Sequence, residues 1–138
     1  MRRHVLLGLV LVGVAGCTIY PFVERVGGVK IRPENSRVLH AVPASGTAIV
    51  YLDVVNHGGA DDTLVGVLSE AAERAELRSR RRRIREISVP AARTVPLAST
   101  DRHIELYDLK RELKTGDVIV VTLVFVKSGA IGAVTVVQ

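Results

Sequence analysis

The amino-acid sequence predicts an all-β fold, a sandwich or barrel built from short strands. Valine is abundant, above all in residues 118–126 and 131–137, and β-branched side chains favour strands. Turn residues recur between short apolar segments, and no segment keeps a helical period long enough for a helix of several turns. Short strands with turns at regular spacing are typical of β-sandwiches and β-barrels.

The expected strands follow one another from residue 29 to the C-terminus. In residues 47–56, Ala48, Val50, Leu52 and Val54 alternate with their neighbours, as in a strand that buries one face. Residues 118–126 are expected to form the longest strand. The expected strands are 29–32, 38–43, 47–56, 63–69, 75–78, 87–89, 94–97, 103–109, 118–126 and 133–137, and the breaks between them are 33–36, 56–62, 71–73 and 113–117.

The N-terminus has the features of a lipoprotein signal peptide. A basic start at residues 1–4 precedes the uncharged run 5–14, which is shorter than the roughly 20 apolar residues that span a bilayer. The run ends in Val-Ala-Gly-Cys at 14–17, which looks like a bacterial lipobox. We therefore expect a signal peptide at 1–16, acylation of Cys17 and a tether at 17–28. The alternative is a plain secretory signal that Cys17 happens to follow.

These features predict where the protein lies and what holds it there. Cys17 is the only cysteine, so the chain forms no internal disulfide and no thiolate cluster for a metal. We expect the mature protein to be attached by lipid to the outer face of the cytoplasmic membrane, or to an outer membrane, and to face the periplasm or cell exterior.

The positive charge is concentrated in one short segment. The chain carries a formal net charge of +5, whereas the mature domain outside residues 78–85 is mildly acidic. This basic segment is expected to be a solvated hairpin tip, a contact with anionic lipid headgroups, or a docking site for an acidic partner. Scarce aromatic residues and an extracytoplasmic location argue against nucleic acid as a partner. The arginines of the segment are Arg78, Arg80, Arg81, Arg82, Arg83 and Arg85.

No sequence motif points to an enzyme. The chain has no His-Glu-x-x-His motif, no glycine-rich phosphate loop and no defensible Ser-His-Asp order. Asp61 and Asp62 are adjacent carboxylates in an expected turn, and neighbouring strand residues face opposite sides. We therefore expect a protein without catalytic residues.

Several stretches resemble one known family in order and spacing. The most specific is Asp-Leu-Lys-Arg-Glu-Leu-Lys-Thr-Gly-Asp at 108–117. With the other stretches it resembles the periplasmic copper chaperones called PCu(A)C, over roughly residues 38–138. The resemblance implies a cupredoxin-like, immunoglobulin-like Greek-key β-sandwich at 29–138. It also implies a role in delivering Cu(I) to a respiratory oxidase. The other stretches are 56–67, 71–77, 87–97 and 121–125.

The same resemblance implies that the copper site is largely lost. The family's first histidine and one methionine correspond to Arg78 and Arg80, and its His-x-Met pair corresponds to His103 and Glu105. Met1 is the only methionine, so no thioether site for soft Cu(I) can form in the mature chain. Copper is thus a cofactor by family resemblance only.

His103 is the one retained ligand position. It has two interpretations: a metal contact shared with Glu105, suited to Cu(II) or Zn²⁺, or a polar residue kept without a metal role. His40 and His57 are isolated in the sequence and are not expected to bind metal. Two functions therefore remain: a copper-handling lipoprotein with a degenerate site and an oxidase-assembly or other protein partner, or a non-metal module that binds protein or membrane through its arginines.

Overall fold

The computed structural model describes residues 28–138, so the expected signal peptide, Cys17 and nearly all of the tether lie outside the described residues. Within the described part every regular element is a strand, and no helix there is long and apolar enough to cross a membrane. The strands are β1 (Ile31–Val38), β2 (Ala48–Asn56), β3 (Asp62–Leu68), β4 (Ala72–Ser79), β5 (Arg82–Arg83), β6 (Ile87–Val89), β7 (Thr94–Leu97), β8 (His103–Leu109), β9 (Val118–Phe125) and β10 (Gly129–Val137).

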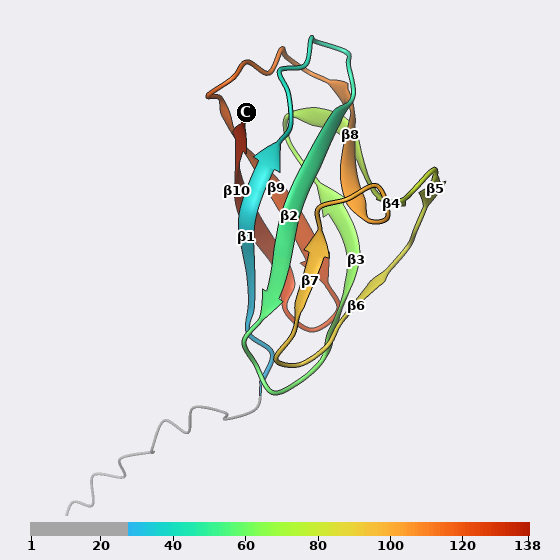
Figure 1. Cartoon of the computed structure of the whole chain (residues 1–138), viewed down its shortest axis with the longest axis vertical. Helices are drawn as coiled ribbons and strands as arrows, with labels where there is room; N and C mark the ends of the chain where they lie inside the picture. The colour runs from blue at the N-terminus through green and yellow to red at the C-terminus, as the bar shows by residue number, and fades with distance from the viewer. Residues whose placement is uncertain (1–27) are drawn as a thin grey trace, which may run out of the picture.

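The strands form one curled sheet whose two halves face each other as a sandwich (Figure 1). The strand order is β5-β4-β8-β2-β1-β10-β9-β3-β6, and β7 pairs with β2 beside β8. All pairs are antiparallel except β1 with β10, which meet only at residues 37–38 and 136–137. The all-β prediction is confirmed.

Alternating burial along the strands builds the core between the two halves. In β2 the predicted alternation is confirmed, because Ala48, Val50, Leu52 and Val54 are all fully buried. Aliphatic side chains from the other strands fill the same core, and burying each one fully is worth roughly 1.5–3 kcal/mol relative to exposure.

Several expected boundaries were wrong. The expected turn at 33–36 lies inside β1, where Asn35 has φ 54° and the pairing with β2 shifts register, so the strand bends without ending. Residues 39–43 do not continue this strand. The expected break at 71–73 is where β4 begins, and β10 starts at Gly129 instead of residue 133. β2 and β10 have nine residues each and β9 has eight, so the expectation that residues 118–126 form the longest strand was wrong.

The turn after β2 is held together by the buried polar side chain of Asn56. The Asn56 amide donates to the carbonyls of Ala60 and Val89, and its oxygen accepts from the Gly58 N–H at 2.9 Å. Gly58 lies so close to the chain entering β1 that a Cβ there would lie 1.9 Å from the Gly28 carbonyl oxygen, and only glycine fits.

Asp62, the first residue of β3, fastens the turn between β9 and β10 to that strand. Its carboxylate accepts hydrogen bonds from the backbone N–H groups of Thr63, Lys127 and Ser128 and from the Ser128 hydroxyl, at 2.6–2.9 Å. Burial acts to raise the pKa of Asp62, but these hydrogen bonds outweigh it and hold the pKa below the usual 3.8. The Asp61 carboxylate instead accepts a hydrogen bond from the Ala91 N–H, so the two carboxylates have separate structural roles.

We predict that Asp62→Asn lowers the free energy of unfolding at neutral pH by about 1–3 kcal/mol, because buried N–H donors lose their charged acceptor. A carboxyl with a lowered folded-state pKa stabilises the fold above its unfolded pKa of 3.8, and this contribution is lost as pH falls through the folded-state value. Urea denaturation across the acid range should therefore show the gap between Asp62→Asn and the unmodified protein closing at low pH. The exposed control Glu73→Gln should show no such gap, and a gap independent of pH would contradict this role.

Candidate functional site

The register between β4 and β8 gathers charged residues on the outer face of the sandwich. Arg78 lies opposite His103, and Glu76 lies opposite Glu105. Side chains two residues apart on a strand face the same side, so these positions share one surface. The inner face of the same two strands is apolar, with Leu77 among the buried core residues. We call the outer group, with Arg74 and Tyr107, the ion cluster.

His103 is the buried centre of the ion cluster and is only 5% exposed. Its Nε2 lies 2.9 Å from Glu105 Oε1, and its Nδ1 lies 3.2 Å from the Ser99 carbonyl oxygen. The Tyr51 ring meets the imidazole edge-on, with centroids 6.4 Å apart. Both ring nitrogens therefore face oxygen acceptors. His103 and Glu105 lie on the same side of β8, as residues two positions apart on a strand do.

Glu105 is held as a carboxylate by the groups around it. Burial acts to raise its pKa, but hydrogen bonds from Tyr107 and His103 and the nearby charges of His103 and Arg78 outweigh burial and lower it. The Tyr107 hydroxyl donates to Glu105 Oε2, while Oε1 faces the imidazole. Both oxygens of this carboxylate are thus occupied.

Arg78 turns toward the sheet surface instead of joining the exposed arginines. Its Nη1 lies 3.4 Å from Glu76 Oε2, its Nε 3.9 Å from Glu105 Oε2, and its Nη2 donates to the Arg81 carbonyl at 2.6 Å. The buried Nε makes no hydrogen bond within residues 28–138. Arg74 completes the group. Its Nη1 lies 3.4 Å from Glu76 Oε1, and its guanidinium carbon lies 4.4 Å from the centre of the Tyr107 ring.

The residues of the ion cluster do not suit Cu(I). This ion prefers thiolate and thioether ligands, and residues 28–138 contain neither cysteine nor methionine. Two guanidinium groups already balance the two carboxylates, so the cluster offers an added cation no net attraction. Within the described residues no three histidine, cysteine, aspartate or glutamate side chains come together as a metal site.

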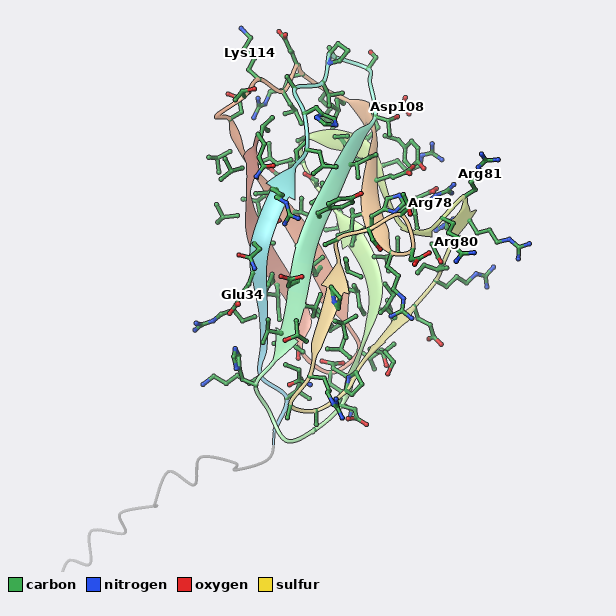
Figure 2. The ribbon with its side chains drawn as sticks, viewed as in Figure 1. Glu34, Arg78, Arg80, Arg81, Asp108 and Lys114 are labelled. Carbon is green, nitrogen blue, oxygen red and sulfur yellow. The ribbon has the colours of Figure 1, made fainter. Side chains whose placement is uncertain are left out.

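The other arginines of residues 78–85 lie on the arm formed by β4 and β5, which projects from the body of the sandwich (Figure 1). Arg80 occupies the turn with φ 54° and pairs with the exposed Asp101 at 2.8 Å. Figure 2 shows Arg80 and Arg81 toward the end of this arm, with Arg78 nearer the sheet. The segment thus separates into one residue of the ion cluster and a set of exposed charges.

The remaining sequence candidates lie elsewhere. His40 is exposed in the bend after β1. His57 is exposed in the turn after β2, and its Nε2 lies 3.9 Å from Glu34 Oε1. Sequence reasoning overlooked Arg74, Glu76 and Tyr107, the three residues that complete the ion cluster. The signal was available: charged and aromatic residues repeat at every second position in 74–78 and 103–107.

The fold and the altered site define a class, the PCuAC-type β-sandwich. A solved structure described as the copper-bound PCuAC domain from PmoF2 is 27% identical and has a TM-score of 0.69, covering 80% of this chain and 95% of that one. The apo PCuAC domain from PmoF1 is also 27% identical, with a TM-score of 0.64, covering 82% and 95%. The predicted cupredoxin-like Greek-key sandwich is confirmed.

The chain belongs to the LpqE-like family, whose model residues 29–137 match. The solution structure of Cu(I)-bound DR1885 from Deinococcus radiodurans shares the fold at 22% identity and a TM-score of 0.66, covering 83% of this chain and 81% of that one. No curated protein matches the sequence.

We predict that Glu105→Gln lowers the pKa of Tyr107, which burial and then the hydrogen bond and charge of Glu105 together raise to about 12. The burial contribution remains in the variant, so the pKa should fall below about 12 yet stay above the ordinary 10.0. The ring-carbon NMR signals of labelled tyrosine, followed as pH rises, measure this change. The exposed variant Glu112→Gln should leave the titration unchanged, and no effect of Glu105→Gln would refute the contact.

Proposed function

We propose that this protein is an extracytoplasmic, lipid-anchored member of the copper chaperone fold that acts in copper handling without itself carrying Cu(I) at the family position. The 27% identity to a copper-bound PCuAC domain supports the copper connection. The ion cluster supports the second half of the proposal, because both ring nitrogens of the retained histidine already lie within 3.2 Å of an oxygen acceptor.

The observation that carries this proposal is that both ring nitrogens of His103 already face oxygen atoms of the protein. A metal would have to displace either the Ser99 carbonyl or the Glu105 carboxylate from the imidazole, and loss of the latter contact would leave Glu105 Oε1 without its hydrogen-bond partner. Arg78 would stand beside the incoming cation with no softer ligand to compensate. Binding a partner protein then remains as the activity of this fold.

The partner we propose is a protein that receives or holds copper outside the cytoplasm, such as a respiratory oxidase during its assembly. In this scheme the domain supplies a docking surface, and its ion cluster keeps the β4–β8 surface rigid without metal. We assign no catalytic step to any residue.

A second candidate function is a module unrelated to metal that binds protein or membrane through the arginine arm. The exposure of Arg81, Arg82, Arg83 and Arg85 favours it, because four like charges on one arm raise the local potential and attract anions. This candidate shares the lipid anchor and the fold with the first and differs only in the partner.

The lipid anchor on Cys17 gives the first test. We predict that mass spectrometry of the mature protein finds an N-terminus at Cys17 carrying diacylglycerol, and that Cys17→Ser shifts the protein from the membrane to the soluble or uncleaved fraction. An unmodified cysteine, or a mature chain that still begins at Met1, would count against the anchor. The same measurement tests the boundary between the proposed signal peptide at 1–16 and the tether at 17–28, which precedes the domain at 29–138.

The copper site gives the second test. We predict that the purified protein binds Cu(I) no more tightly than about micromolar in competition with a chelator, because His103 offers at most one imidazole. Arg78→His combined with Glu105→Met would add an imidazole and a thioether beside His103, and should tighten binding by several orders of magnitude.

The control for this experiment is Arg80→Met. The Arg80 side chain points to Asp101, so a thioether there should add little by itself, although this position corresponds to a family methionine. Submicromolar binding by the unmodified protein would overturn the proposal, and His103, His40 and His57 would then be the first residues to replace.

A further inference from the structure

The two halves of the sandwich are not hydrogen-bonded to each other between β3 and β4. On this side β3 pairs with β6 only at residues 62–64, so residues 65–68 have a strand partner on the β9 side alone. β4 pairs with β8 along its length and with β5 only at 78–79, apart from a bond from the Ile84 N–H to the Leu77 carbonyl. Both strands therefore turn backbone groups without ladder partners toward the same space.

A cleft of about 410 Å³ opens in this space. Polar groups form the larger part of its walls and aliphatic side chains the rest, and Arg83 and Arg85 are among the lining residues. Glu76 is the single acid that lines it, and both of its oxygens are already paired with Arg74 and Arg78. The lining residues are Val65, Gly66, Val67, Ala75, Glu76, Leu77, Arg83, Ile84 and Arg85.

The charges beside this cleft have no acidic partner in the described chain. Arg81, Arg82, Arg83 and Arg85 are exposed, and none of them forms an ion pair with a carboxylate of residues 28–138. In contrast, Arg80 on the same arm is paired with Asp101. The cleft thus combines aliphatic side chains, open strand edges and unneutralised positive charge.

We propose that the cleft between β3 and β4 binds an extended, acidic segment of a partner protein. The segment would add to an open strand edge, place apolar side chains against Val65 and Ile84, and direct carboxylates to Arg83 and Arg85. This proposal names the kind of partner for the protein-binding role given above, and rests on it.

The shape of the cleft favours a protein segment over a membrane. A lipid surface is flat and could reach the end of the arm, but the aliphatic side chains and the open edges lie in a cleft. An extended chain with alternating acidic and apolar side chains matches all three features, because its two side-chain faces differ and its backbone supplies donors and acceptors.

The test uses the protein purified from membranes in mild detergent. The probes are a fluorescein-labelled peptide of alternating glutamate and valine, an all-glutamate peptide of equal length, and vesicles rich in phosphatidylglycerol. The alternating peptide should bind at low salt and shift the backbone NMR signals of residues 65–68 and 75–77. Arg83→Glu with Arg85→Glu should weaken its binding by about tenfold or more, because charge pairs at an interface become repulsive.

Two further variants make the test specific. Arg93→Glu with Arg102→Glu makes the same change of charge at exposed positions outside the cleft, and should leave binding nearly unchanged. Val65→Ser, at a residue 41% exposed, should weaken binding of the alternating peptide alone, because it removes an apolar contact and adds no charge. Equal binding of both peptides, an equal loss in both arginine pairs, binding to vesicles only, or no binding of the alternating peptide would each overturn the proposal.

Failure here is distinguishable from failure of the proposed function. Tight Cu(I) binding by the unmodified protein would overturn the metal-free role and leave the peptide result standing. Absence of peptide binding with weak Cu(I) affinity would remove this cleft as the docking site and leave the metal-free role intact.

Discussion

The antiparallel register between β4 and β8 is the constraint on which the candidate site depends. It sets Arg78 opposite His103 and Glu76 opposite Glu105, and a shift of either strand by one residue would turn its own two side chains into the apolar core. Burial of Leu77, Ile104 and Leu106 on the inner face fixes that register. The chemistry of the outer face is therefore positioned by the packing of the inner one.

Charge that is buried at such a surface must be paired, and the pairing here uses the strong donors and acceptors of the centre with one exception, the Nε of Arg78. His103, Glu105 and Tyr107 satisfy one another, and Arg78 bridges the two carboxylates with its Nε left without a hydrogen bond. Breaking a buried pair by removing one partner costs more than the intact pair contributes. A site closed in this way favours one fixed arrangement of side chains over exchange of a metal ligand.

The same sandwich is closed by hydrogen bonds on one side and open on the other. Near the C-terminal end β10 meets β1, so the sheet continues from one half to the other. Between β3 and β4 no ladder forms, and the chain crosses there through the short arginine arm instead. Edge strands are commonly protected by charge or by covering segments, and here the arginines occupy that position. Protection of the edge and attraction of an acidic partner follow from the same residues.

The sequence by itself determined the all-β class and most strand positions, because alternation in β2 and the valine-rich C-terminal segments admit little else. It also determined that a soft-ligand copper site is absent from residues 28–138, since that follows from composition. Residues 33–36 and 71–73 were misjudged because pairing with β2 and β8 overrode local turn preference. Only the tertiary structure decided that Arg78 packs against the outer face of β4 and β8 while the neighbouring arginines remain exposed. It also decided that Arg74, Glu76 and Tyr107 complete the ion cluster. Those contacts join strands separated by more than twenty residues, and register and burial set them where spacing along the chain cannot.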